Sequence, residues 1–280
     1  MTAVISGIFG KNHFGSKGGE ASIEDFGVIL MADKMVSFGV TGLEANVSKI
    51  DIICTENGTF VAAGGSGGLG WLNEFFVKIK SSDKSKLTTV RDYAKEGGKI
   101  YREILRDDFN RTFLDPYGID IKEVFKKTTP EDFQRYITDN IEKWKDHYLG
   151  WEFIICGVDK EGPHIYTVSN GDYSPNDMLG YEVTGSGTPS AQWVLAHEQY
   201  DPRKDRAYSL FMTTYAKRQA EESLGVGQRT DAILISNKGV EFIKEEIIDK
   251  IKKEIDIMLD DKKKDISKKI EYLKDNGVVK

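Results

Sequence analysis

The sequence contains few cysteines and no long hydrophobic run. Only Cys54 and Cys156 occur, each within an apolar segment where a small buried thiol is the ordinary occupant. We therefore expect a reduced, intracellular protein. No apolar segment approaches the roughly 20 residues that cross a bilayer, and no basic leader with a following apolar stretch opens the chain. The sequence thus predicts a cytoplasmic protein without a membrane partner.

Positive charge is not in excess either. The chain has 39 Lys and Arg against 45 Asp and Glu, for a net charge of −6. We expect no nucleic-acid partner, although a local basic patch stays open. The glycine-rich segment 64–68 lacks the frame of a phosphate-binding loop and favours a tight strand-to-helix turn. No metal or cofactor is expected, because no metal-ligand spacing involves the four histidines, His13, His147, His164 and His197.

Several segments are apolar at almost every position. A strand with one buried face alternates apolar and polar residues, so continuous apolar runs indicate strands covered on both faces. Hairpin-like links, TENG and DKEG, join two of these runs to neighbouring strand-like segments and favour antiparallel pairing. The runs are 26–33, 59–65, 151–159 and 231–236.

Amphipathic segments follow the strand runs in two pairs. Apolar residues recur at helical spacing in 71–80 and 88–109, and again in 189–200 and 205–224. The order is strands, two helices, strands, two helices, strand. It predicts an α+β protein, a four-layer αββα sandwich of two antiparallel sheets flanked by helices.

Two segments are additions to this plan. Residues 115–149 contain a helix start at 129–132 and are interpreted as a helical insertion. From about residue 240 an apolar stripe favours a helix that lies on its own domain over a partner-binding helix. We expect one domain at 2–243, including the insertion, and a C-terminal helical extension at 244–280. The stripe comprises Ile243, Ile247, Ile251, Ile255, Met258, Ile266, Ile270 and Leu273.

Five segments, in order, resemble the catalytic β-type subunits of the proteasome, which are N-terminal nucleophile (Ntn) hydrolases. They are Thr2, GVILMADKMVS with Asp33, NVSKIDII with Lys49, FVAAGG, and VTGSGTPSAQWVLAHEQY. The resemblance spans roughly residues 2–85 and 150–243. Each segment alone is a weak signal, but five in order, each on the expected element type, are more specific. The resemblance implies the Ntn-hydrolase fold and a threonine-type peptidase or amidase.

The resemblance places the nucleophile at Thr2, which becomes the first residue once Met1 is removed. An alcohol is a poor nucleophile until a nearby base takes its proton. An α-amine has a pKa of about 7.7 to 8.0, against about 10.4 for a lysine, so the amine of Thr2 is the better general base near neutral pH. The alternative is an ordinary second residue with no chemical role.

The resemblance implies roles for four other residues. Lys49 would be an ammonium that lowers the pKa of the amine and stabilises negative charge on Oγ1. Asp33 would hold Lys49 charged. Ser186 corresponds to the serine that shuttles the amine proton, and Gly64 to the glycine whose N–H faces the oxyanion. The plainer alternatives are a surface lysine, a turn-forming aspartate and a turn serine.

The sequence departs from the family pattern in two places. About fifteen extra residues, 11–25, separate the first two strands and are predicted to form a mobile loop that covers the site or contacts substrate. The family also carries an Asp before its last strand, and AEESLGVGQRTD offers no aligned Asp. Glu222 is the nearest substitute, with Glu221 behind it, and either is otherwise an exposed charge at a helix end.

Position within the family pattern also predicts the residues that contact a peptide substrate. Small side chains would line a roomy first pocket, and one residue would offer backbone hydrogen bonds to an extended peptide. The pocket residues are Val36, Val47, Ala62 and Ser66, and the backbone donor is Ser37.

The sequence leaves three functions open. The first is a peptidase or amidase that hydrolyses an acyl-enzyme on Thr2, and the second is a peptide ligase that passes the same acyl group to an amine. The third is a catalytically inactive scaffold or assembly subunit, as the α-type subunits of this fold are. Those subunits carry a helix ahead of the first strand, and its absence here favours catalysis. We expect a peptide or protein substrate and a homo-oligomer or proteasome-like assembly.

Overall fold

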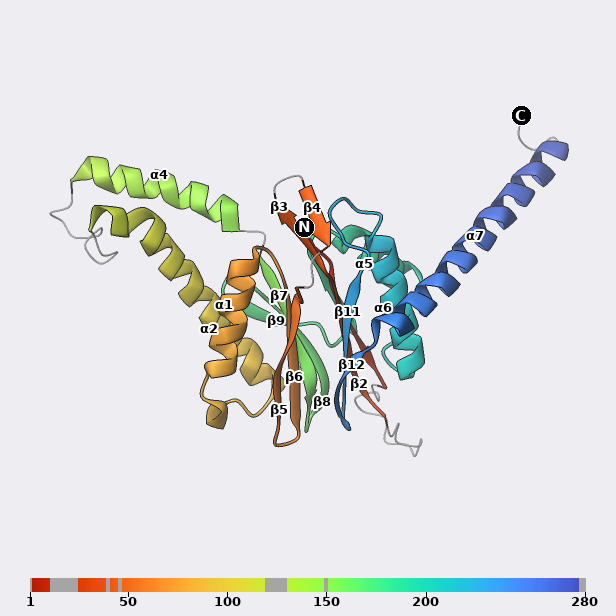
Figure 1. The fold of residues 1–280 in the computed structure, drawn as a ribbon, viewed down its shortest axis with the longest axis horizontal. Coiled ribbons are helices and arrows are strands. Elements are labelled where there is room, and N and C mark those ends of the chain that lie inside the picture. The colour runs from red at the N-terminus through yellow and green to blue at the C-terminus, as the bar shows by residue number, and fades with distance from the viewer. Residues whose placement is uncertain are drawn as a thin grey trace.

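The protein is a sandwich of two five-stranded antiparallel sheets, each covered on its outer side by helices (Figure 1). The computed structural model describes residues 2–10, 25–38, 41–44, 47–118, 130–148 and 151–276. This arrangement is the αββα architecture predicted from the order of apolar and amphipathic segments.

The first sheet carries the N-terminal strand in its interior. Its strands are in the order β10, β1, β2, β11, β12 and every neighbouring pair is antiparallel. Val4 pairs with Ala32 of β2, so the start of β1 lies beside the end of β2. The strands are β10 (Tyr181–Thr184), β1 (Val4–Phe9), β2 (Gly27–Asp33), β11 (Thr230–Ser236) and β12 (Gly239–Ile243).

The second sheet contains both predicted hairpins. Strands β5 and β6 pair across the TENG link, and β7 and β8 pair across DKEG. The order is β5, β6, β7, β8, β9, and all pairs are antiparallel. The strands are β5 (Ile50–Glu56), β6 (Thr59–Ser66), β7 (Glu152–Asp159), β8 (Gly162–Ser169) and β9 (Asp172–Pro175).

Continuous apolar runs occur because both faces of the central strands are covered. All seven residues of β2 are buried, some against the opposite sheet and some against helices. Cys54 and Cys156 are buried free thiols, as expected. The core between the sheets includes Val4, Ile8, Val28, Leu30, Ala32, Ile50, Ala62, Ile154, Ile165, Ile233 and Ile235.

Each outer layer is a pair of helices, as the amphipathic segments predict. Helices α1 (Leu69–Ser81) and α2 (Val90–Phe109) cover the second sheet, and a short 3-10 turn (Lys84–Lys86) lies between them. Helices α5 (Thr188–His197) and α6 (Arg206–Ala220) cover the first sheet. Helix α2 begins with the capping box of Thr89 and Asp92, which satisfies otherwise unpaired backbone N–H groups.

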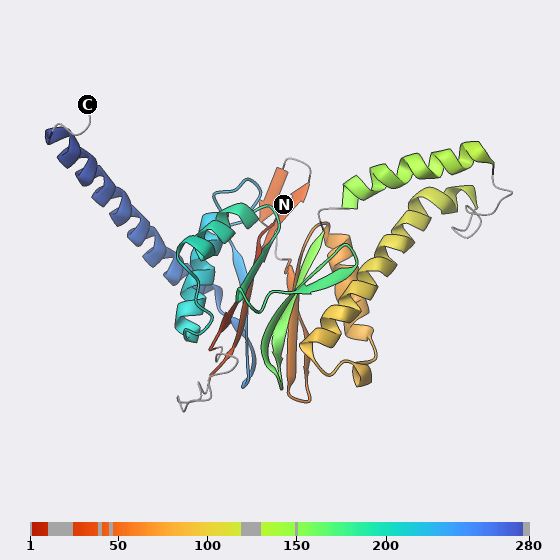
Figure 2. The same ribbon diagram turned by 180° about the vertical axis from the view of Figure 1, so that it is seen from behind.

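The insertion first extends the chain beyond α2 and then turns back, so that its helix lies beside the end of α2. A π-helical turn (Asn110–Leu114) and a 3-10 turn (Asp115–Tyr117) follow α2 directly. Helix α4 (Glu131–Tyr148) then begins where the sequence predicts a helix start, although Thr129 lies outside the described residues. A small cluster that includes Phe109, Leu114 and Ile137 joins the segments. Figures 1 and 2 show α4 beside the end of α2, projecting away from the sandwich.

The C-terminal helix α7 (Glu245–Asp275) packs on the domain only along its first part. Ile248 and Ile255 are fully buried, and α7 contacts α6 and β11. Further along, Ile266 is 57% and Ile270 44% exposed, and the helix extends into solvent (Figures 1 and 2). The expectation of a helix lying on its own domain was therefore right for the first part of α7 and wrong for the second.

One hairpin was not anticipated. Strands β3 (Met35–Phe38) and β4 (Thr41–Glu44) form a two-stranded sheet beside the end of the sandwich where β1 begins (Figure 1). The predicted loop at 11–25 falls largely on residues 11–24, which lie outside the described residues. Among the described helices, none combines the length and hydrophobicity needed to cross a bilayer.

Candidate active site

Thr2 lies buried two residues before β1, held by a glycine-rich turn. Gly187 N–H donates to the Thr2 carbonyl at 3.1 Å, and Ser186 Oγ donates to it at 3.3 Å. Gly185 has φ +99°, and a Cβ there would lie 2.3 Å from the same carbonyl oxygen. Because only glycine adopts this backbone without a clash, the TGSG turn can close against Thr2.

Asp33 is brought to Thr2 by the pairing of β1 with β2. Asp33 N–H donates to the Ala3 carbonyl at 3.2 Å, which sets the end of β2 against the start of β1. The Asp33 Oδ1 atom accepts hydrogen bonds from Thr2 Oγ1 at 2.6 Å and from Ala3 N at 2.8 Å. The carboxylate is wholly buried, so these donors replace the water that it has lost.

Lys49 reaches the same point from the second sheet. It immediately precedes β5 and is 4% exposed. Its Nζ donates to Thr2 Oγ1 and lies 2.9 Å from Asp33 Oδ2. Gly65 N–H donates to the Lys49 carbonyl at 3.1 Å and fixes the backbone of the lysine to β6. The threonine hydroxyl is thus in contact with both a buried carboxylate and a buried ammonium.

The charge state of Asp33 follows from this environment. Burial raises the pKa of its carboxyl, but the Lys49 ammonium and the hydrogen bonds from Thr2 and Ala3 outweigh this effect and hold the pKa below its usual value. Asp33 is therefore ionised throughout the neutral range and keeps Lys49 compensated as a buried cation.

Ser186 contacts the backbone nitrogen of the proposed nucleophile. Thr2 N donates to Ser186 Oγ at 3.1 Å. Ser186 itself is exposed, whereas Thr2 is 3% exposed. The structure thus brings together four of the predicted residues: Thr2, Asp33, Lys49 and Ser186.

Gly64 lies in β6 opposite Ile50, the residue after Lys49. A Cβ at this position would come within 2.8 Å of Val4 and Ile50 side chains, so the close approach of β1 and β5 excludes a larger residue. This packing accounts for glycine by itself, independently of the oxyanion role expected for its N–H.

Glu222 is not brought to Thr2 by any described contact. Its side chain is 66% exposed and lies 3.2 Å from Arg218 on the surface. The preceding carboxylate, Glu221, points inward and is 4% exposed. It bonds to Lys217 at 2.7 Å and to Lys252 at 2.7 Å. The two neighbours separate because α6 ends at Ala220, where one side chain faces α7 and the other faces solvent.

The residues predicted to contact substrate occupy different environments. Ala62 is fully buried between the sheets, and Ser66 Oγ lies 3.0 Å from Thr184 Oγ1. Val47 is 40% exposed just before Lys49. Val36 and Ser37 lie on β3, whose backbone is described while their side chains lie outside the described part.

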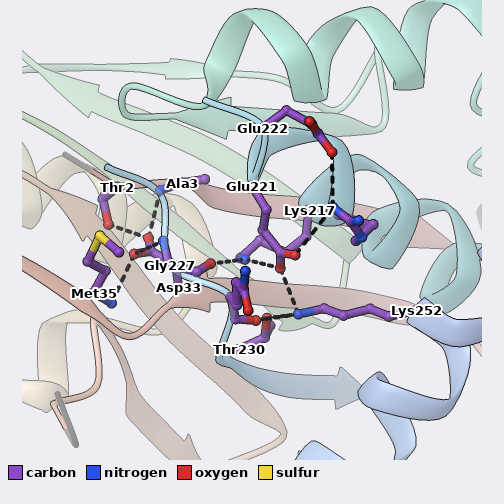
Figure 3. A network of polar contacts seen from close by, with 12 residues as sticks. Thr2, Ala3, Asp33, Met35, Lys217, Glu221, Glu222, Gly227, Thr230 and Lys252 are labelled. Atoms are coloured by element: carbon purple, nitrogen blue, oxygen red, sulfur yellow. Dashed lines mark hydrogen bonds and ion pairs between the residues drawn. The ribbon is translucent and has the colours of Figure 1, made fainter. Parts of the chain in front are cut away.

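The sequence did not indicate that the loop between α6 and β11, residues 221–229, would complete the surroundings of Asp33 (Figure 3). Asp33 Oδ2 accepts from Met35 N at 3.0 Å and from Gly227 N at 3.2 Å, in addition to Lys49. Behind the loop, Lys217 Nζ donates to the Gly227 carbonyl at 2.7 Å. The signal in the sequence was the spacing of Lys217 and Glu221, four residues apart near the end of an amphipathic helix.

Comparison with known proteins gives a similarity at the level of the family. No protein-family model matches the chain. Over 188 residues it is 26% identical to a protein named proteasome subunit beta 1 from Korarchaeum cryptofilum (strain OPF8), an alignment that covers 64% of this chain and 85% of the relative. The similarity supports a relationship to proteasome-β-like proteins and fits the αββα sandwich described above.

Proposed function

We propose that this protein is a threonine-type peptidase or amidase related to proteasome β subunits, with Thr2 as its nucleophile once Met1 has been removed. The observation that carries the proposal is the buried contact of Thr2 Oγ1 with both Asp33 and Lys49. A structural threonine has no need of a buried cation at its hydroxyl, since an ammonium in the protein interior is costly. A hydroxyl that must carry negative charge during a reaction does benefit from one.

The general base in this proposal is the α-amine of Thr2. With Met1 in place the Thr2 nitrogen belongs to a peptide bond and has no basic lone pair. After removal of Met1 it becomes an amine, within 3.1 Å of Ser186 Oγ. The nearby Lys49 ammonium disfavours a second positive charge and so favours the neutral, basic form of the amine.

Acylation and deacylation then use the same groups. Thr2 Oγ1 attacks the substrate carbonyl as its proton passes to the amine, and the proton next goes to the departing amine of the substrate as the C–N bond breaks. Water attacks the resulting ester as the amine of Thr2 takes one of its protons, and the amine passes this proton to Oγ1 as the C–O bond breaks and the carboxylic acid leaves. Lys49 stabilises Oγ1 as negative charge develops on it, and Asp33 maintains the charge of Lys49.

The chemistry of the proposed nucleophile and the name of the relative support a substrate class. A nucleophile of this kind acts on peptide or other amide carbonyls, and the β3–β4 hairpin lies beside the end of the sandwich where the chain begins (Figure 1). The Korarchaeum relative is named as a subunit, so an oligomeric or proteasome-like assembly in the cytoplasm is part of the proposal.

A β-lactone probe tests the proposal. Such a probe opens on a nucleophilic hydroxyl and adds its full mass as an ester, which intact-protein mass spectrometry detects along with the loss of Met1. We expect labelling of the wild type at Thr2, none in Thr2→Ala, and a rate at least about 100-fold lower in Lys49→Ala, since one preorganised charge contributes on the order of 3 kcal/mol. Unchanged labelling in Thr2→Ala would eliminate the proposed nucleophile.

Two further outcomes separate the other functions of this fold. Retention of Met1 together with absence of labelling would indicate a catalytically inactive assembly subunit. If an amide substrate incubated with excess free amine yields mainly the transferred product, the acyl-enzyme serves a ligase and not a hydrolase.

A further inference from the structure

A buried charge cluster joins the C-terminal helix to the loop that donates to Asp33 (Figure 3). Its members are Lys217 and Glu221 at the end of α6, and Lys252 on α7. Lys217 is 0% and Lys252 9% exposed, and the Glu221 side chain is 4% exposed. A single carboxylate oxygen, Glu221 Oε1, accepts from both lysines at 2.7 Å.

Both lysines also donate to the backbone of the same loop. Lys217 Nζ donates to the Gly227 carbonyl at 2.7 Å, and Lys252 Nζ donates to the Gln228 carbonyl. Lys252 Nζ further contacts Thr230 Oγ1 at 3.1 Å, where β11 begins. Two successive carbonyls of one loop are therefore held by two buried ammonium groups, an expensive arrangement for a loop without a special task.

The loop's special contact is with the active-site carboxylate. Gly227 N–H donates to Asp33 Oδ2 at 3.2 Å, the oxygen that also pairs with Lys49. Displacement of the loop would remove this donor and alter the orientation of the carboxylate that holds Lys49 against Thr2. The path from Lys252 to Thr2 is thus continuous: Lys252 and Lys217 to the loop, Gly227 to Asp33, and Asp33 to Thr2.

We propose that Lys217, Glu221 and Lys252 are positioning residues for Asp33, so that Lys252 connects α7 to the support of the proposed active site. The proposal rests on the function proposed above for Thr2. It assigns a task to Glu221, and to a helix that lies outside the segments resembling the proteasome family. Burial lowers the pKa of Lys217 and the Glu221 carboxylate offsets part of this effect, which leaves the pKa at about 8, so the charge on this lysine depends on the carboxylate beside it.

Substitution of Lys252 tests the proposal, with its exposed neighbour on α7, Lys253, as the matched control. The variants are Lys252→Met, Lys252→Arg, Glu221→Gln and Lys253→Met. The measurements are the two-step kinetics of β-lactone labelling, which separate probe binding from the acylation rate, and amide hydrogen exchange at Gly227. Should Lys252→Met fail to fold, Lys252→Gln takes its place, since it keeps a hydrogen-bond donor without the charge.

We expect Lys252→Met and Glu221→Gln to bind the probe within about twofold of the wild type but to acylate at least about tenfold more slowly, which corresponds to 1.4 kcal/mol or more. Gly227 should exchange at least about tenfold faster. Lys252→Arg should acylate at nearly the wild-type rate and keep Gly227 exchange nearly as slow, since it keeps the charge and the donors. Lys253→Met should change neither the acylation rate nor the exchange.

Acylation or Gly227 exchange within twofold of the wild type in a folded Lys252→Met protein would overturn the inference. Absence of labelling in the wild type would contradict the proposed function instead. In that case the exchange at Gly227 alone decides whether the cluster holds the loop, so failure of the function and failure of the inference remain distinguishable.

Discussion

Asp33 and Gly227 are 194 residues apart in the chain, yet the Gly227 N–H donates to Asp33 Oδ2 at 3.2 Å. With this contact the buried carboxylate accepts from five donors: Thr2 Oγ1, Ala3 N, Met35 N, Lys49 Nζ and Gly227 N. A carboxylate with this many donors is held as an anion in one orientation, which is what a fixed counterion for Lys49 requires.

The ionisation of Asp33 predicts a stability difference that depends on pH. Because its pKa is lowered from 3.8, ionised Asp33 stabilises the fold fully above pH 3.8, and this contribution disappears as the pH falls through the lower, folded-state pKa. Asp33→Asn should therefore be less stable than the wild type at pH 7, and the gap should narrow below pH 3.8. Urea denaturation at pH 7, 5 and 3 measures it, and a constant gap would contradict the prediction.

Removal of the Lys49 charge should destabilise the protein strongly. Lys49→Met leaves Asp33 as a buried anion without its cation, which costs about 3 kcal/mol of unfolding free energy. Lys80→Met breaks the exposed pair with Asp51, where both side chains are at least 36% exposed, and should cost no more than about 1 kcal/mol. Urea denaturation of both variants at pH 7 tests this order, and equal costs would refute it.

Gly185 should tolerate no side chain, because its φ of +99° is strained for other residues and a Cβ would meet the Thr2 carbonyl. Gly185→Ala should cost about 3 kcal/mol of stability and reduce labelling of Thr2. Gly58→Ala is the control: its φ is +74° but nothing lies within 4 Å of its Cβ, so only the backbone strain of about 1 kcal/mol applies. Thermal unfolding compares the two, and similar costs would exclude the steric explanation.

His164, on β8, should make a stability contribution with a pH dependence opposite to that of Asp33. Burial lowers the pKa of His164, but Asp159 and Asp177 outweigh this and raise the pKa to about 9 from 6.5. Because its pKa is raised in the folded protein, protonated His164 stabilises the fold fully below pH 6.5, and this contribution disappears as the pH rises through 9. His164→Asn should therefore cost about 2 kcal/mol more at pH 6 than at pH 9.5. Chemical denaturation at both pH values checks it; a cost independent of pH would argue against the ion pairs.

The two parts of α7 should respond differently to change. Ile255 is fully buried, so Ile255→Ala should cost about 3 kcal/mol. Among the described residues, removal of 260–280 deletes mainly exposed side chains and a single ion pair with the rest of the domain, between Lys262 and Glu198, and should cost no more than about 1 kcal/mol. Thermal unfolding of the shortened chain tests this, and a large loss of stability would mean that the outer part of α7 supports the domain.

Much of the fold was readable from the sequence because its strands are covered on both faces. The runs containing β2, β6, β7 and β11 are continuous and apolar, and the helices between them are amphipathic. The β3–β4 hairpin was missed because its strands have only four residues each and carry little periodic signal. The outer part of α7 keeps the apolar spacing of a packed helix, so periodicity alone gives no sign that it leaves the domain.

The sequence predicted the site residues for which the resemblance supplied positions, and it gave less guidance for the others. Thr2, Asp33, Lys49 and Ser186 converge as the resemblance implies, while Glu222 points to solvent and Glu221 turns inward. Lys252 falls among the isoleucines of α7, where a lysine is ordinarily read as a solvated charge. Lys252 instead bonds to Glu221, because α7 packs against α6. This contact is long-range, and no local sequence pattern encodes it.

Thr2 and Asp33 belong to one sheet, whereas Lys49 belongs to the other. Elsewhere the two layers are joined mainly by apolar packing. Such packing has no preferred direction, so it opposes sliding of one layer over the other less than a ladder of hydrogen bonds would. A small shear of one layer over the other would therefore lengthen the ammonium-to-hydroxyl contact while every strand pairing stayed intact. Mutations that loosen the interlayer packing, far from the chain's beginning, should for this reason impair reactivity before they unfold the protein.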